Sequence, residues 1–367
     1  MALIEHLYFH IPFCPKLCPY CCFYVEEGSR NKNQAFLDAL LLEVERACDS
    51  HLIRPKTLYF GGGTPTSLLL PQLEFLLSNL HKRLPLGSLQ EWTMEANPAT
   101  IRPEKAALLR DMGVTRISLG VQSWNDSCLK TLGRVHSSAQ ARKTVDILHS
   151  TGFPGLNLDL MFSVPGQTLA QWEEDLHTTL QLAPSHISAY CLTYEEDTDF
   201  FRKRAGGQFV QNEEHDAQLF ELTMDRLGAA GFRQYEISNY APPGKESRHN
   251  QAYWEGKCFL GFGPSAFSTL PGERTQNVPD TARYVQCVLA GQDPVSSREP
   301  LTDAIRLRER IAFGLRMEEG LESELLAAWP AETAALQSDG LLETVGSRLR
   351  LTRRGKLLAD SVAEAFL

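Results

Sequence analysis

The sequence lacks the features that mark a secreted or membrane-spanning chain. No uninterrupted apolar run reaches the roughly 20 residues that a helix needs to cross a bilayer. The first ten residues, MALIEHLYFH, contain neither a basic segment followed by a long apolar one nor an arginine-rich leader. We therefore expect a cytoplasmic protein, in which cysteines stay reduced or bind metal rather than form disulfides.

The sequence also lacks an excess of basic residues. Its 36 lysines and arginines are outnumbered by 45 acidic residues, which gives a formal net charge of −9. Nucleic-acid binding requires a clustered basic face, so we expect no nucleic-acid partner. One local exception lies near the C-terminus, where a basic run without an intervening acid comprises Arg348, Arg350, Arg353, Arg354 and Lys356. We expect this run to serve packing or a protein partner.

Cysteine is scarce, with nine in 367 residues, yet four lie within nine positions: Cys14, Cys18, Cys21 and Cys22. The Cx3Cx2C spacing of the first three lets one loop wrap a single ion or cluster. A structural zinc site needs four ligands, and no second CxxC or HxxxH follows. Zinc with Cys22 or His10 as fourth ligand remains the alternative. Three thiolates favour a [4Fe-4S] cluster with one iron open to another ligand, and Cys22 has no assigned role.

Short β-rich runs alternate with amphipathic helices up to about residue 195. The predicted strands are residues 7–13, 57–60, 91–97, 116–123, 156–164 and 186–194. Helices between them are marked by an apolar stripe and by capping residues, at Phe36 to Val44, Pro103 and Gly113, Ser137 and Gly152, and Thr168 with Gln171. This order predicts an α/β fold, a partial (β/α)6 barrel with a parallel sheet.

Three regions are expected along the chain. Residues 1–235 form the partial barrel, and residues 236–299 form a connecting region. The polar stretch GQDPVSSREP then leads into residues 300–367, whose helices, small β-ribbon and final helix predict a winged-helix-like α+β domain.

Unusual residues gather where the predicted strands end. The cysteine loop follows the first strand and GGGTP, residues 61–65, follows the second, while Glu95, Gln122 and Asp159 lie at or within the next three. The carboxyl ends of parallel strands meet at one rim, where such folds bind their ligands. We expect a cofactor site at this rim.

The motifs YFHIPFC, GGGTPT, EANP, GVQS, LGR and PGQT, together with the Cx3Cx2C loop, resemble the radical S-adenosylmethionine (SAM) superfamily. They look most like the branch of oxygen-independent coproporphyrinogen III oxidase and the haem chaperone HemW. The resemblance implies that Cys14, Cys18 and Cys21 hold a [4Fe-4S] cluster whose open iron chelates SAM. It also implies that a reductant such as flavodoxin or ferredoxin drives cleavage of SAM to a 5′-deoxyadenosyl radical.

The same resemblance implies which residues surround the cofactors. Glu95 and Asp159 would accept hydrogen bonds from the SAM ribose or ammonium, and Arg134 would pair with its carboxylate. The glycines would let the backbone approach the SAM amino group, and Phe13 and Phe23 would shield the cluster. The full set is Tyr8, Phe23, Gly61, Gly62, Gly63, Thr64, Glu95, Gln122, Arg134 and Asp159.

Three features favour the HemW type over the oxidase. Phe23 stands where the oxidases have a further cysteine, and only 13 residues precede Cys14. His249, Asn250, Tyr253 and Trp254 match the HNxxYW signature that the HemW type associates with haem, so His249 is a candidate haem ligand. His136, His186 and His215 are expected to be ordinary.

We therefore expect a chaperone that binds haem, the cluster and SAM and delivers haem to recipient proteins. The alternative is a SAM-dependent coproporphyrinogen III oxidase or another tetrapyrrole-directed radical enzyme, because nothing in the predicted SAM site is missing.

Overall fold

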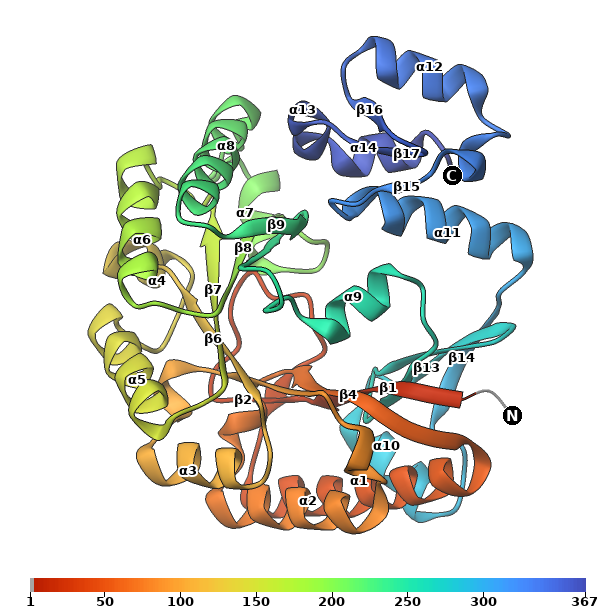
Figure 1. The fold of residues 1–367 in the computed structure, drawn as a ribbon. Helices are drawn as coiled ribbons and strands as arrows, with labels where there is room; N and C mark the ends of the chain where they lie inside the picture. Colours follow the sequence, from red (N-terminus) through yellow and green to blue (C-terminus); the bar gives the residue numbers. More distant parts are fainter. Residues whose placement is uncertain (1–2) are drawn as a thin grey trace.

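The computed structural model describes residues 3–367, and its main sheet contains the six predicted parallel strands (Figure 1). They are β1 (Leu3–Ile11), β4 (Leu52–Gly62), β5 (Glu91–Ala96), β6 (Arg116–Gln122), β7 (Gly155–Phe162) and β8 (His186–Cys191). Each pairs in parallel with the next. Strand β11 (Leu260–Phe262) adds to one edge, and the antiparallel strands β10 (Asn239–Ala241) and β9 (Arg233–Glu236) add to the other. The sheet does not close on itself, so the prediction of a partial barrel is confirmed.

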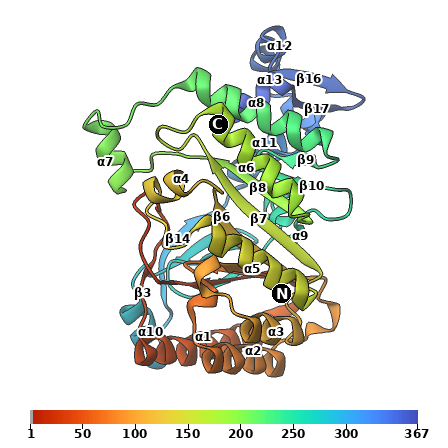
Figure 2. The same ribbon diagram turned by 90° about the vertical axis from the view of Figure 1, so that its left-hand side faces the viewer.

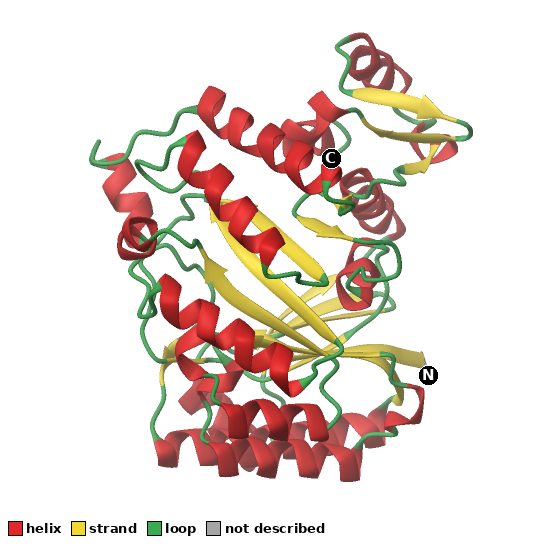
Figure 3. Ribbon diagram, turned by 60° about the vertical axis from the view of Figure 1, so that its left-hand side comes forward, coloured by secondary structure: helices red, strands yellow, loops and turns green. Residues whose placement is uncertain are grey.

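Helices cover the outer face of this sheet (Figure 3). They are α1 (Arg30–Ser50), α2 (Leu70–Arg83), α3 (Pro103–Asp111), α4 (Asp126–Thr131), α5 (Ser138–Thr151), α6 (Leu169–Gln181), α7 (Asp199–Ala205) and α8 (Glu213–Ala229). The predicted caps are present. Ser137 and Thr168 each form a capping box, and Gly152 ends α5 with a left-handed φ of 77°. Figure 2 shows α7 projecting from the molecule beyond the cysteine loop and α4.

Side-chain alternation along the strands gives the sheet two unlike faces. Residues such as Phe9, Phe60 and Trp92 are fully buried against the helices. Phe9 stacks on Phe60, with ring centroids 4.4 Å apart, and each such buried side chain stabilises the fold by about 1.5–3 kcal/mol. The residues between them point toward the barrel interior, and some of these, such as Glu91 and Asp159, have polar side chains.

Residues 236–299 contribute to the barrel as well as connecting it to the C-terminal domain. They supply β10, α9 (Arg248–Trp254) and β11, and then an antiparallel sheet of β12 (Phe267–Leu270), β13 (Glu273–Asn277) and β14 (Val295–Pro300). Helix α10 (Thr281–Leu289) packs against α1. The main sheet therefore extends past the expected boundary at residue 235.

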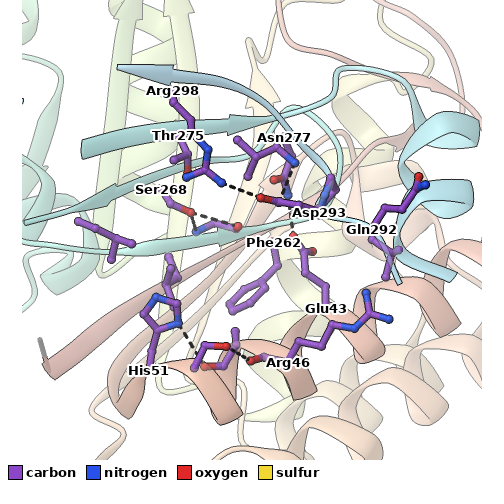
Figure 4. Close-up of a pocket in the computed structure, with 18 of the residues that line it drawn as sticks. Glu43, Arg46, His51, Phe262, Ser268, Thr275, Asn277, Gln292, Asp293 and Arg298 are labelled. Atoms are coloured by element: carbon purple, nitrogen blue, oxygen red, sulfur yellow. Dashed lines mark hydrogen bonds and ion pairs between the residues drawn. The ribbon is translucent and has the colours of Figure 1, made fainter. Parts of the chain in front are cut away.

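Glu43 on α1 fixes this later part of the chain to the barrel (Figure 4). Its carboxylate accepts hydrogen bonds from the Tyr284 hydroxyl at 2.6 Å, the Asn277 amide at 2.7 Å and the Gly263 backbone at 2.9 Å. It borders a cavity of about 380 Å3 between α1 and β11–β13. Burial raises the pKa of Glu43 to about 7, even though the three donors act in the opposite direction.

The C-terminal domain has the predicted winged-helix-like form. Its helices are α11 (Asp303–Arg316), α12 (Pro330–Ser338), α13 (Arg353–Leu357) and α14 (Ala359–Glu364), and its strands are β15 (Leu321–Glu322), β16 (Leu342–Val345) and β17 (Arg348–Leu351). The strands form a separate sheet in the order β15-β17-β16, over a core of its own.

The basic run of this domain is largely neutralised by acids. Arg348 pairs with Glu322, and Arg350 pairs with Glu343 at 2.8 Å. Arg353 reaches Asp225 on α8 at 2.6 Å. These contacts support the expected packing role. No helix in residues 3–367 is both long and apolar enough to cross a membrane.

Candidate functional site

The cysteine loop leaves the carboxyl end of β1 and is pinned at both ends. A short parallel pair, β2 (Phe13–Cys14) and β3 (Glu26–Glu27), joins its start to its finish. Within it, the Cys21 amide donates to the Cys18 carbonyl at 3.1 Å. Cys14, Cys18 and Cys21 are half-buried, whereas Cys22 is exposed. The loop thus separates the three predicted ligands from the fourth thiol.

Burial and mutual repulsion favour the protonated thiols of Cys14 and Cys21. Burial raises the pKa of Cys14, and it raises the pKa of Cys21 to about 11, with Cys18 and Cys14 adding repulsion. Arg134 donates an N–H to the Cys18 sulfur at 3.6 Å, and its positive charge lowers the pKa of Cys14 in opposition to burial. Thiolates at these positions therefore require a positively charged partner.

The described residues do not form a site for a lone metal ion. Within residues 3–367, no three His, Cys, Asp or Glu side chains converge closely enough to hold one metal ion. A [4Fe-4S] cluster instead takes one thiolate at each of three separate corners, so its ligands need not converge on a point. Ligation of such a cluster by Cys14, Cys18 and Cys21 stays a prediction.

The glycine run at the end of β4 is held close against β1. A Cβ on Gly62, whose φ is 94°, would lie 2.5 Å from the His10 ring, and one on Gly63 would lie 2.8 Å from the Ile11 carbonyl oxygen. A Cβ on Gly61 would lie 2.9 Å from the Glu95 carboxylate. These contacts give the glycines a packing role beside the predicted approach to SAM. Thr64 follows, with its hydroxyl 3.5 Å from the Cys14 sulfur.

Two carboxylates face the interior beside this loop. Glu95 accepts a 2.7 Å hydrogen bond from the Tyr59 hydroxyl, and burial raises its pKa to about 7. Asp159 accepts from the Ser118 hydroxyl at 3.0 Å and from the Asn157 amide at 2.7 Å. Burial also raises the pKa of Asp159. A cationic or hydroxyl-bearing ligand would stabilise the charged carboxylate forms of both residues, so both are suited to bind such a ligand.

Gln122 and Arg134 complete the rim. Gln122 has a φ of 69°, unusual for a residue with a Cβ, at an irregularity in the pairing of β6 with β7. Such strain is found where a side chain must be aimed at a ligand. Arg134 donates to the Gly120 carbonyl at 2.8 Å, and its Nε is buried without a partner among the described residues. That N–H group is available to a bound anion.

The three aromatic residues predicted near the cofactors lie in different surroundings. Tyr8 lies at the rim, with its hydroxyl 3.0 Å from His10 Nδ1. Phe13 is a core residue packed on Phe36, and Phe23 exposes 66% of its surface. Phe23 therefore shields the cluster position only if it moves or if a ligand covers it.

Sequence reasoning considered His10 only as a zinc ligand and did not single out Tyr59, although both hold predicted site residues in place. His10 bridges Tyr8 and the Tyr24 carbonyl of the cysteine loop, and Tyr59 orients Glu95. The available signal was strand alternation, because His10 lies two positions after Tyr8 on the same face of β1.

Comparisons with known proteins bear on this arrangement. The sequence profile of the Radical SAM superfamily matches residues 8–179. The haem chaperone HemW of Bacillus subtilis is 34% identical over 99% of this chain and 99% of its own length. HemW of Escherichia coli is 34% identical over 98% and 97%. The chain belongs to the HemW family of radical SAM proteins. Membership implies a [4Fe-4S] cluster and SAM as cofactors.

The HemW-type chain also shares its fold with a solved oxidase structure. Coproporphyrinogen III oxidase (HemN) from Escherichia coli superposes with a TM-score of 0.85, at 24% identity, over 99% of this chain and 90% of that one. The likeness extends through the C-terminal domain and concerns the fold alone.

The HNxxYW segment of this HemW-family chain closes the opposite end of the barrel. Glu91, at the start of β5, accepts from the backbone N–H groups of Arg248 and His249 at 3.0 and 3.1 Å. Arg116 pairs with the same carboxylate at 3.3 Å. Helix α9 thereby plugs the amino ends of the strands, far from the cysteine loop.

His249 is enclosed within this plug. Its Nδ1 is 2.7 Å from the Thr57 hydroxyl, and its ring stacks on Tyr59 with centroids 5.1 Å apart. Burial lowers its pKa to about 3, so the ring is neutral. Trp254 packs edge-on against Phe313 of α11. A haem role for His249 stays a prediction, and the ring is not exposed at the surface.

Proposed function

We propose that this chain is a haem chaperone that binds haem and passes it to recipient proteins in the cytoplasm. The observation that supports this most is the near full-length similarity to proteins named haem chaperone HemW. Phe23 in place of a further cysteine and the HNxxYW segment point the same way.

In this proposal the rim holds the cofactors. Cys14, Cys18 and Cys21 ligate the cluster, and Arg134, beside Cys18, offers its free Nε–H to the SAM carboxylate. Glu95 and Asp159 accept from the SAM ammonium or ribose hydroxyls. When bound and reduced, the cluster supplies the electron that cleaves SAM in this superfamily. The described residues around it exclude water and fix the orientation of SAM.

Haem transfer is the direct test. Purified protein should bind haem saturably, with a shift of the Soret band. It should then transfer the haem to a tagged haem-free acceptor, such as an apo-cytochrome, which is recovered separately through its tag. Bovine serum albumin loaded with haem serves as the control for passive exchange. Non-saturable uptake, or transfer no faster than from albumin, would contradict the chaperone proposal.

The alternative is a coproporphyrinogen III oxidase, favoured by the shared fold with HemN and by the complete set of rim residues. On the chaperone proposal, reduced protein with SAM yields no protoporphyrinogen from coproporphyrinogen III. Chromatography of the porphyrin products measures this, with HemN as positive control. SAM-dependent loss of two carboxyl groups would reverse the assignment.

A further inference from the structure

A groove of about 700 Å3 lies on the outer side of the HNxxYW segment. Its lining residues come mainly from the end of α9, from strand β12 and from helix α11. Helices α9 and α11 contact each other where the barrel meets the C-terminal domain (Figure 1). Sites for small molecules and cofactors commonly have volumes of roughly 300–1,000 Å3 and form where domains meet. The groove therefore has the size and position of a ligand site.

The floor and walls of the groove are aromatic. Tyr253 and Phe259 pack together with ring centroids 4.3 Å apart, and Phe313 faces them from α11. Phe267 on β12 exposes 46% of its surface at the groove. Large apolar side chains gathered at an exposed concave surface indicate a partner that covers them.

The lining of the groove carries a slight excess of positive charge although the chain as a whole is acidic. Four basic residues and three acidic residues line it, a local excess of one positive charge in a chain of net charge −9. They are Lys257, Arg274, Arg306 and Arg310, with Glu255, Asp303 and Glu309. The groove thus combines apolar walls with cations at its margin.

Two of these cations are available to a ligand. Arg306 and Arg310 stand four residues apart on α11, a spacing that places both on one side of the helix. Arg306 donates only to the Leu270 carbonyl, at 2.9 Å, and Arg310 has no acid within 4.0 Å among residues 3–367. Arg274, by contrast, is held by Glu299 and Glu309. Arg306 and Arg310 form a pair of unneutralised guanidinium groups beside an aromatic wall.

We infer that this groove is the haem site, an inference that rests on the haem-chaperone proposal. Haem is a flat, mainly apolar macrocycle with two propionate groups on one edge. Its face would lie on Tyr253, Phe259 and Phe267, where apolar area is removed from water. Its propionates would pair with Arg306 and Arg310, whose planar guanidinium groups match carboxylates in two parallel hydrogen bonds.

The geometry also separates this site from His249. His249 does not line the groove, although its ring centroid is 5.0 Å from that of Tyr253. Its Nδ1 is engaged by Thr57, and its Nε2 is buried without a partner among the described residues. Among the described residues that line the groove there is no His, Cys or Met, and burial raises the pKa of the Tyr253 phenol, which disfavours a phenolate ligand. The groove holds haem by its ring and propionates, and His249 positions Tyr253.

Haem titration of the full-length protein, followed by Soret absorbance, compares Arg310→Gln with Arg308→Gln. Both arginines are exposed on α11, but only Arg310 lines the groove, so the two variants lose the same charge from the same helix. We expect Arg310→Gln to raise the haem Kd about tenfold and Arg308→Gln to change it less than twofold. Equal changes in the two variants would overturn the groove assignment.

Two probes test how the ligand is held. Haem dimethyl ester lacks free propionates, so wild type and Arg310→Gln should bind it equally. Metal-free protoporphyrin IX should bind wild type with an affinity close to that of haem, because no protein ligand to iron is required. A large preference for haem over protoporphyrin IX, abolished in His249→Ala, would instead assign the iron to His249 and overturn the inference.

The apolar wall is tested by Phe267→Ser against Phe201→Ser, an exposed phenylalanine on α7 that lies outside the groove. We expect only Phe267→Ser to weaken haem binding, by about fivefold or more. If wild type binds haem saturably while every groove variant matches it, the groove assignment fails and the chaperone proposal stands. If wild type shows no saturable haem binding, the chaperone proposal itself fails.

Discussion

Three of the four clustered cysteines differ from the fourth in their surroundings. Cys14 lies beside Thr64, Cys18 beside Arg134, and Cys21 is half-buried within the turn, whereas Cys22 is exposed. A buried thiol beside hydrogen-bond donors can hold metal in a fixed geometry, whereas an exposed one is free to rotate into solvent. The difference supports the prediction that the first three residues, and not Cys22, ligate the cluster.

We predict that Ser variants of Cys14, Cys18 and Cys21 lose iron after anaerobic reconstitution and that Cys22→Ser keeps it. Iron and sulfide per chain, with EPR of the reduced sample, measure the outcome. Cys22→Ser is also the control for the loss of any thiol from this loop. Full zinc occupancy without iron uptake in wild type would contradict the cluster.

Glu91 anchors α9, the helix that closes the amino end of the barrel and forms its floor. It is 4% exposed and accepts from Arg116, Ser247, Arg248 and His249. Removing it would leave the buried Arg116 guanidinium and the first N–H groups of α9 without their acceptor.

We predict that Glu91→Ala lowers the free energy of unfolding by about 3–5 kcal/mol, the cost of breaking a buried ion pair from one side. Glu74→Ala, at an exposed position on α2, should change it by less than about 0.5 kcal/mol. Urea unfolding followed by circular dichroism gives both values. A loss in Glu91→Ala no larger than that in Glu74→Ala would show that α9 holds the floor without this carboxylate.

At the scale of elements, local signals predicted local structure. The six central strands and the caps of α5 and α6 follow from periodicity and from residues within one turn of each other. The position of α9 did not follow, because it depends on a contact between Glu91 and residues more than 150 positions later. The sequence of α9 places aromatic side chains on both the barrel side and the groove side, and nothing local distinguishes them.

Helix α1 and strand β11 are joined through Glu43, whose pKa of about 7 exceeds its ordinary value of 4.5. A carboxyl with a raised pKa favours the folded state when protonated, so its contribution is complete below about pH 4.5 and is lost as the pH rises through about 7. We predict a smaller fall in Tm between pH 5 and pH 8 for Glu43→Gln than for wild type, measured by differential scanning fluorimetry. Parallel Tm curves would contradict this.

Across the whole molecule, the cluster loop and the groove lie at opposite ends of the barrel. The loop leaves the carboxyl end of β1, whereas α9 covers the amino ends of the strands. We predict that Cys14→Ser, which lacks the cluster, binds haem with a Kd within about twofold of wild type in the same Soret titration. Arg310→Gln should show the reverse behaviour, with full iron content and weaker haem binding. Loss of haem binding in Cys14→Ser would mean that the two ends are coupled.

The pairing of β1 with β11 has a consequence during synthesis. Leu7 on β1 pairs with Leu260 on β11, so β1 cannot form this pairing until most of the chain has been synthesised. At about 5–20 residues per second, a ribosome takes roughly 10–50 s to cover that interval. Through this time α9 does not yet cover the amino ends of the strands, and the outer edge of β1 is unpaired. A nascent chain of this protein therefore presents an open strand edge to other chains until residue 260 has been made, and such an edge is a template for aggregation.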